Sequence, residues 1–284
     1  MFSYLIPSYA IITFVMNAET ITFLAFALFF GLVIGSFLNV LIYRLPNKMP
    51  FVMERSICPS CKSGIAWYDN IPLLSFVVLR ARCRKCGTRI SWHYPMVEFL
   101  NGILYVAVVY KELIIAPAGY QPVLRTVSFL FFVSALIAIS FIDARHHIIP
   151  NKITYTGLII GPILLLSADP SKIFFYLSGL LIGGGYLLLV DIAWITIKKT
   201  EGMGFGDVKL GAMLGVFLGW PVFIAIFFAS LTGIIYNVGA SLLKKQSMEE
   251  TLKTAFGFGP FLAIGGILTY FAGTWIISAY FSIF

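Results

Sequence analysis

The sequence has few charged residues. Asp, Glu, Lys and Arg make up only 11% of its 284 residues, whereas hydrophobic residues make up 60%. Soluble globular domains are about one quarter charged, because their surfaces face water. A soluble domain of this length is therefore excluded, and several apolar runs approach the length of a bilayer-crossing helix. The sequence predicts an all-α polytopic membrane protein.

Acidic residues are scarcer than basic ones, 12 against 20. The net charge of +8 does not indicate a nucleic-acid partner, because the basic residues are sorted by membrane side. The positive-inside rule places the loop 44–95 in the cytoplasm and both termini outside, which leaves only Lys111, Arg125 and Lys172 on the outer side. The apolar runs predict about eight transmembrane helices, over 20–43, 96–115, 125–142, 153–169, 173–197, 208–220, 222–243 and 258–282.

A signal peptide, a low-complexity segment and a convincing internal repeat are all lacking. Residues 1–16 are apolar but contain no Lys or Arg and no small-residue cleavage site, unlike a secretory signal. We expect 1–19 to be an N-terminal extension, either a short surface segment or residues upstream of a start at Met16. The remaining chain then divides into a first transmembrane helix (20–43), a soluble domain (44–95) and a seven-helix membrane domain (96–284).

Only four cysteines are present, and all lie in the loop 44–95. They form two Cys-x-x-Cys pairs, Cys58 with Cys61 and Cys83 with Cys86, a spacing that lets both thiolates of a pair face one tetrahedral ion. The sequence therefore predicts a structural Zn²⁺ site that staples a domain too small for a large core. The alternatives are disulfides, which a reducing cytoplasm disfavours, or unpaired thiols.

Acids at membrane depth are rare, and two of them fall at the same predicted level. Asp143 closes the third helix and Asp207 opens the sixth, both on the cytoplasmic side. Two carboxylates that meet can share one proton, so that one activates water while the other polarises a carbonyl. This pattern predicts an aspartic protease. The alternative for Asp207 is a helix N-cap after the glycine-rich stretch 202–206.

Four further polar residues allow two interpretations each. His146 and His147 beside Asp143 are either metal ligands or interfacial side chains, and the second is the more common role. Asp191 and Glu98 are either additional functional acids or hydrogen-bonded residues near helix ends.

Taken together, these segments resemble the bacterial type IV prepilin peptidase and N-methyltransferase family of Gly-x-Gly-Asp membrane aspartic proteases. The resemblance rests on 35–46, the two cysteine pairs, 67–72, 94–98, 142–143, 204–210 and 258–260. It implies that Asp143 and Asp207 form a catalytic dyad, and that Cys58, Cys61, Cys83 and Cys86 bind Zn²⁺. It also implies an active-site loop set of Gly204, Gly206, Lys209, Phe258, Gly259 and Pro260.

The resemblance implies two activities in the inner membrane. One cleaves the basic leader of type IV prepilins or pseudopilins at the cytoplasmic face. The other methylates the new N-terminal amine with S-adenosylmethionine, and is assigned to the domain 44–95. No Rossmann-type glycine fingerprint is present, so the cofactor-binding residues stay unknown. Asn151 departs from the family pattern, which usually has an acid at this position.

Three other functions compete with this interpretation. The first is an aspartic protease without methyltransferase activity, of the preflagellin or signal-peptide type, which the cysteine pairs disfavour. The second is a metal-binding transporter with Asp143, Asp191 and Asp207 along a cation path, although two of these acids cluster on one side. The third is a non-catalytic scaffold for pilus assembly. The particular prepilin and the oligomeric state do not follow from the sequence.

Overall fold

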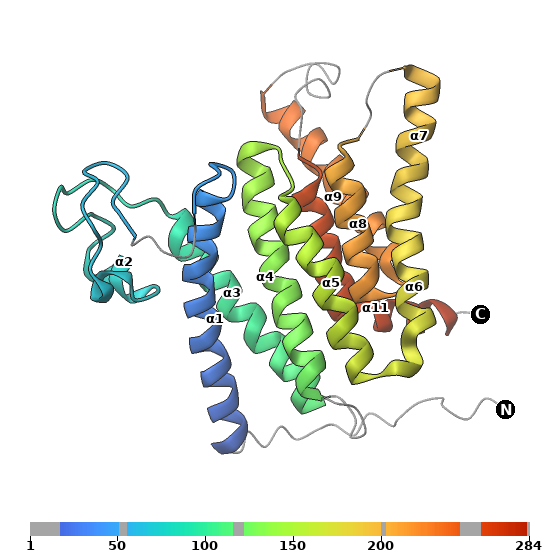
Figure 1. Ribbon diagram of the computed structural model, residues 1–284, viewed down its shortest axis with the longest axis horizontal. Coiled ribbons are helices and arrows are strands. Elements are labelled where there is room, and N and C mark those ends of the chain that lie inside the picture. Colours follow the sequence, from blue (N-terminus) through green and yellow to red (C-terminus); the bar gives the residue numbers. More distant parts are fainter. Residues whose placement is uncertain (1–17, 51–55, 116–121, 200–202, 245–256, 283–284) are drawn as a thin grey trace.

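The computed structural model describes residues 18–50, 56–115, 122–199, 203–244 and 257–282, so most of the predicted extension 1–19 lies outside the described residues. Helices dominate this part of the chain (Figure 1). The long ones are α1 (Ala18–Arg44), α3 (His93–Val109), α4 (Pro122–His146), α5 (Asn151–Ala168), α6 (Ile173–Leu180), α7 (Tyr186–Lys198), α8 (Phe205–Leu218), α9 (Val222–Lys244) and α11 (Gly259–Phe281).

Six helical segments of the described chain are long and apolar enough to cross a membrane. They are α1, α4, α5, the run Pro170–Lys198 that contains α6 and α7, most of α9, and α11. The all-α polytopic architecture is thus confirmed, but the count of eight spans is not. The 14 residues of α8 extend only about 21 Å, against about 30 Å of hydrocarbon core. The 17 residues of α3 continue as a π-helix, η2 (Tyr110–Ile115).

Helix α4 is the centre of the bundle. Figure 1 shows α1 and α3 on one side of it and α5, α8 and α11 on the other. Two thirds of its apolar window is buried, more than in any other candidate span. Phe132 of α4 stacks on Phe217 of α8 with ring centroids 4.7 Å apart, and both side chains are almost fully buried. The middle of α4 is therefore packed tightly against α8.

Glycines let α8 lie directly against α6 and the π-helix η4 (Leu181–Gly185). A Cβ added at Gly211 would lie 2.7 Å from the Gly183 carbonyl oxygen, and one added at Gly215 would overlap the Gly179 carbonyl. Small residues four apart permit such close backbone approach between helices in membranes. We call these four residues the glycine seam; it fixes the depth of α8 by backbone contact.

A charged cluster joins three helical segments at the end of the bundle away from His146. Glu112, only 3% exposed, accepts hydrogen bonds from Arg125 Nε at 3.0 Å and from the Tyr270 hydroxyl at 2.8 Å. Lys111 Nζ lies 3.9 Å from the centroid of the Tyr270 ring. Arg125 and Lys111 were expected on the outer side of the membrane, and the structure places both around one buried carboxylate.

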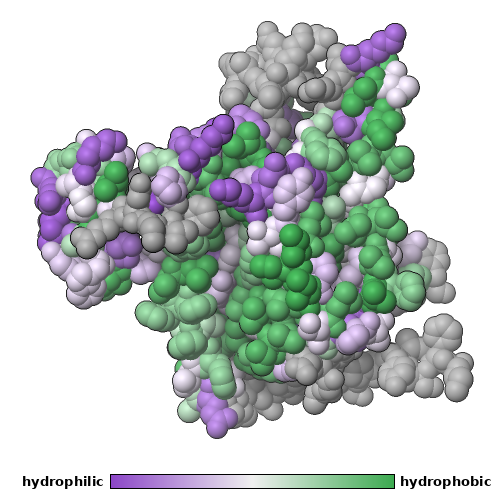
Figure 2. All heavy atoms as spheres, in the orientation of Figure 1, coloured by the Kyte–Doolittle hydropathy of each residue, from purple (hydrophilic) through white to green (hydrophobic). Residues whose placement is uncertain are grey.

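The surface separates into apolar and polar zones. In Figure 2 hydrophobic residues cover the middle of the helices, and hydrophilic ones gather at the end where α4 finishes and on the cysteine domain. We use the name cysteine domain for residues 56–92, which include the short helices η1 (Trp67–Asn70) and α2 (Leu74–Val78). It lies beside the half of α1 that ends at Arg44 (Figure 1). This zoning fits a multi-pass membrane protein.

Candidate active site and metal centre

Asp143 lies in the last turn of α4, and its side chain is held by the start of α11. The residue is only 3% exposed, and its Oδ2 accepts a hydrogen bond of 3.0 Å from the Gly259 backbone N–H. Its own carbonyl accepts from the His147 N–H at 2.9 Å, which closes the helix. His147 then adopts a left-handed backbone with φ of 52°, which ends α4 beside the carboxylate.

Asp207 lies in the first turn of α8, and the alternative that it caps this helix is wrong. Gly204 occupies the N-cap position, and its carbonyl accepts from the Asp207 N–H at 2.9 Å. The Asp207 side chain makes no cap bond. Its Oδ1 is buried and has no hydrogen-bond partner among the described residues. Buried polar atoms are normally bonded, so an unbonded one in a cavity indicates a place for water or a ligand.

The two carboxylates line one cavity of about 390 Å³. Its wall combines residues from the end of α4, the start of α8 and the segment before α11, three parts of the chain far apart in sequence. Four of the other predicted site residues also line this cavity: Gly204, Gly206, Lys209 and Phe258. A fifth, Gly259, contacts Asp143 through its backbone N–H. Pro260 is not among the lining residues.

Glycines surround Asp143 because no side chain fits there. A Cβ added at Gly257 would lie 2.6 Å from Asp143 Cγ, and one added at Gly259 would lie 2.8 Å from Oδ2. Gly257 was not predicted as a site residue, although its alternation with Gly259 is visible in the sequence. On the opposite wall, a Cβ at Gly206 would lie 3.1 Å from Ile149 Cβ. The cavity is therefore bounded largely by backbone.

Lys209 joins α8 to the start of α5. Its Nζ donates to the side-chain oxygen of Asn151. It also lies 5.2 Å from the Phe205 ring centroid and 5.5 Å from that of Tyr155. The charge of Lys209 therefore meets a neutral amide at this position.

Asp191 and the two histidines do not complete a metal site. Asp191 Oδ1 accepts from the Met203 N–H at 3.1 Å, and Asp191 is not among the residues that line the cavity. His147 lines the cavity, but His146 does not. Among the described residues, the four cysteines are the only group of three or more His, Cys, Asp or Glu side chains that lie close enough together to hold one metal ion.

The four cysteines converge in the cysteine domain. Their Sγ atoms all lie within 4.8 Å of one another, and none forms a disulfide. Cys58 Sγ and Cys86 Sγ are 3.9 Å apart. Tetrahedral coordination at a Zn–S distance of about 2.3 Å puts ligand sulfurs about 3.8 Å apart. The donor set and its spacing thus fit a closed tetrahedral metal site.

The two cysteine pairs have the same backbone geometry. The N–H groups of Cys58 and Cys83 donate to carbonyls five residues later, and each cysteine carbonyl accepts from the residue four positions on. That residue is left-handed in both pairs: Lys62 with φ of 56° and Gly87 with φ of 71°. The Ser63 hydroxyl, 2.9 Å from Cys61 Sγ, lowers the pKa of Cys61 to about 6. Its thiol therefore ionises near neutral pH, as the thiol of a metal ligand has to do.

An ion pair connects η1 to the second cysteine pair. Arg84 donates to both carboxylate oxygens of Asp69, at 2.6 to 3.0 Å, which lowers the pKa of Asp69. Arg84 also lies over the Tyr68 ring, 5.6 Å from its centroid. The segment 67–72 is thereby held against the second cysteine pair.

Comparison with known proteins gives one consistent result. A family model described as the bacterial peptidase A24 N-terminal domain matches residues 29–112, and one described as the type IV leader peptidase family matches 130–238. The first range contains the four cysteines and the second contains both cavity carboxylates. No solved structure matches the chain.

Curated relatives cover most of the chain. It is 37% identical over 234 residues to the prepilin leader peptidase/N-methyltransferase of Myxococcus xanthus, covering 82% of this chain and 67% of the relative. The proteins of the same name from Aeromonas hydrophila and Burkholderia pseudomallei are 34% and 33% identical, over 84% and 88% of this chain and 86% of each relative.

Proposed function

Because the chain belongs to the prepilin leader peptidase/N-methyltransferase family, we propose that it cleaves the leader of type IV prepilins or pseudopilins and methylates the new N-terminal amine. The observation that carries the first activity is the shared cavity of Asp143 and Asp207. We assign the peptidase to the membrane helices of 96–284 and the methyltransferase to the domain 44–95, with S-adenosylmethionine supplying the methyl group.

The proposed cleavage uses both carboxylates as one acid–base unit. Two carboxyl groups in one cavity cannot both ionise cheaply, so the pair holds a single proton at neutral pH. The ionised member removes a proton from water while the protonated member donates a hydrogen bond to the scissile carbonyl. The Gly259 N–H fixes one oxygen of Asp143, and the unbonded Oδ1 of Asp207 is free to meet water or substrate.

The glycine-lined wall suits an extended peptide. A protease must admit the backbone on both sides of the bond that it cuts, and side chains at Gly257 or Gly206 would narrow the cavity. The cavity lies at helix ends rather than in the middle of the bundle, where substrate backbone would lack hydrogen-bond partners. A cut at that level releases the leader into water and leaves the apolar part in the membrane.

We place the cavity and the cysteine domain in the cytoplasm and both termini outside, in the inner membrane. The distribution of basic residues supports this orientation, since only Lys111, Arg125 and Lys172 lie on the other side. In the cytoplasm the four thiolates would hold Zn²⁺, which supplies a structural cross-link and no open coordination position.

The test is cleavage of a co-expressed prepilin, followed by mass spectrometry of the new N-terminus. Asp143→Asn and Asp207→Asn keep the size of the side chain but remove the shared proton, so both should abolish processing. Asp169→Asn is the control, because Asp169 pairs with Lys172 at the far end of α5. A product of wild type that is 14 Da heavier than the free amine would establish methylation.

Either Asn variant cutting at the wild-type rate would overturn the dyad. A wild-type product that is cut but not methylated would support the protease without methyltransferase activity. The transporter alternative is disfavoured, because it requires Asp191 beside the other two acids. Asp191 instead accepts a hydrogen bond from the Met203 N–H and is not among the residues that line the cavity.

A further inference from the structure

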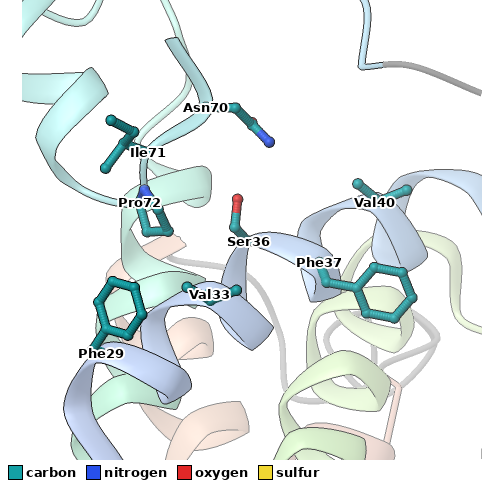
Figure 3. A pocket seen from close by; sticks show the side chains of 8 residues that line it. All are labelled: Phe29, Val33, Ser36, Phe37, Val40, Asn70, Ile71 and Pro72. Carbon is teal, nitrogen blue, oxygen red and sulfur yellow. The ribbon is translucent and has the colours of Figure 1, made fainter. Parts of the chain in front are cut away.

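A second cavity lies between α1 and the cysteine domain. Its volume is about 520 Å³, and α1 contributes Phe29, Val33, Ser36, Phe37 and Val40, while Asn70, Ile71 and Pro72 close it from the domain. Figure 3 shows Ser36 pointing from α1 toward the segment that carries Asn70. This cavity shares no lining residue with the one that contains the two aspartates. We call it the α1 pocket.

A buried acid stands behind the α1 pocket. Glu98 of α3 is 8% exposed, and its Oε2 accepts from the Leu73 N–H at 2.9 Å, directly after Pro72. Its carboxylate also interacts with the Ser36 hydroxyl. Glu98 can lie this close to α1 because α1 has a glycine at the contact: a Cβ added at Gly35 would lie 2.7 Å from Glu98 Cα.

Glu98 has no cationic partner among the described residues. A buried carboxylate without one is costly, and the structure satisfies it only with a backbone N–H and a hydroxyl. The α1 pocket therefore has an apolar wall with one hydroxyl from α1, that of Ser36, and behind this hydroxyl lies the carboxylate of Glu98, which has no cationic partner among the described residues. Such a combination is complementary to a ligand that is apolar and carries a single positive charge.

The depth of the pocket in the membrane further limits which ligands can reach it. Ser36 lies about 12 Å along α1 from the end at Arg44, by helical rise. Phe29 and Phe37 on the same helix are 62% and 46% exposed, so the pocket opens to the side that lipid covers. A ligand that enters from this side comes from the membrane, as an apolar segment or a lipid, and the unpaired acid favours an apolar segment that ends in an amine.

We infer that the α1 pocket binds the N-terminal residue of the cleaved pilin and holds its amine at Ser36 for methylation. This inference rests on the proposed function, because leader cleavage creates a free α-amine at the end of an apolar helix. Phe29, Phe37 and Ile71 would contact the apolar side chain. The Glu98 carboxylate, through the Ser36 hydroxyl, would hold the ammonium and then take up its proton.

The chemistry balances with a methyl sulfonium donor. The ammonium loses one proton, which passes through Ser36 to Glu98. The nitrogen lone pair forms the new N–C bond while the methyl–sulfur bond breaks, and sulfur keeps that electron pair. Glu98 returns the proton to water afterwards. In this scheme Ser36 touches the amine, and Glu98 is a positioning residue that acts through it.

The experiment measures cleavage and methylation in the same product, using the full-length protein in membranes with a co-expressed prepilin. Glu98→Gln keeps an acceptor for the Leu73 N–H but removes the charge, and should lower the methylated fraction about a hundredfold, as loss of a general base does. Val33→Trp fills the pocket and should also abolish methylation. Val127→Trp, at a valine of α4 that is 47% exposed and outside the pocket, is the matched control. Cleavage should stay near the wild-type rate in all three.

Two readouts separate this inference from a structural role of Glu98. In Glu98→Gln, methylation should recover as the pH rises above about 8, where the α-amine deprotonates unaided; a misfolded pocket would not recover. A photo-crosslinker, p-benzoylphenylalanine, in place of Phe37 should capture the product N-terminus, whereas the same group in place of Phe26, 67% exposed on α1, should not.

Three outcomes would overturn the inference. If Glu98→Gln and Val33→Trp both methylate at the wild-type level, the inference is wrong, although the proposed function still holds. Capture of lipid alone at Phe37 would show the pocket to be a lipid site. Cleavage without methylation in wild type would instead remove the methyltransferase half of the proposed function, and the inference with it.

Discussion

Replacing Gly257 by alanine should disable cleavage without unfolding the protein. The added Cβ would lie 2.6 Å from Asp143 Cγ, whereas carbon atoms in contact stay about 3.5 Å apart or more. The carboxyl group or the loop must therefore move by about 1 Å. Misplacement of a reacting group by this distance costs about a hundredfold in rate, or about 2.7 kcal/mol of transition-state stabilisation.

Neighbouring glycines provide a graded series for the same assay. A Cβ at Gly259 would lie 2.8 Å from Asp143 Oδ2, and one at Gly206 3.1 Å from Ile149 Cβ, so each requires a smaller shift. A Cβ at Gly204 would make an ordinary contact of 3.6 Å with Asp207 Oδ2. The expected order of damage is Gly257→Ala, then Gly259→Ala, then Gly206→Ala, with Gly204→Ala close to wild type.

The assay is single-turnover cleavage of a purified prepilin by each variant in proteoliposomes, with thermal unfolding measured in parallel. Single-turnover rates report the chemical step rather than product release. The reasoning is refuted if Gly257→Ala cleaves at the wild-type rate. It is equally refuted if Gly204→Ala is as slow as Gly257→Ala, because crowding of Asp143 would then not be the cause.

Three further predictions concern stability. Removing the metal with a strong chelator should unfold the cysteine domain, measured by its circular dichroism and protease sensitivity, and unchanged sensitivity would contradict a structural metal. Glu112→Ala should destabilise the protein by about 3 kcal/mol, because it leaves the partly buried Arg125 without its carboxylate partner; a thermal midpoint equal to wild type would contradict this. Gly215→Ala should cost about 3 kcal/mol by overpacking the glycine seam, whereas Gly239→Ala, with open space around it, should not.

The sequence predicted the membrane architecture and the candidate site where rare residues carried the signal. Acids are so scarce in apolar runs that Asp143 and Asp207 stood out, and the four cysteines were informative for the same reason. The catalytic role of the two acids stays a prediction. Gly257 was missed because glycine brings no chemistry of its own, and its importance appears only when the carboxylate that it touches is in place.

Other features depended on contacts that no local pattern encodes. Glu112 contacts Arg125 and Tyr270, which lie on two other helices. The positive-inside rule placed Lys111 and Arg125 on the outer side of the membrane, but it could not show that both lie around this carboxylate. The Asp207 N-cap alternative failed because the helix begins at Phe205, so that Gly204, three residues before Asp207, occupies the N-cap position. The α1 pocket needs both the cysteine domain and α1, which only the folded chain brings together.

The shortness of α8 has a consequence for the lipid around the enzyme. A helix about 21 Å long is shorter than the hydrocarbon core, and the backbone contacts of the glycine seam with α6 and η4 keep α8 from sliding along its axis toward either membrane surface. We expect the membrane to thin locally around α8, which would bring water and headgroups down to Asp207. We therefore expect the rate of cleavage to decline as the acyl chains of the bilayer lengthen, although no residue of the protein has changed.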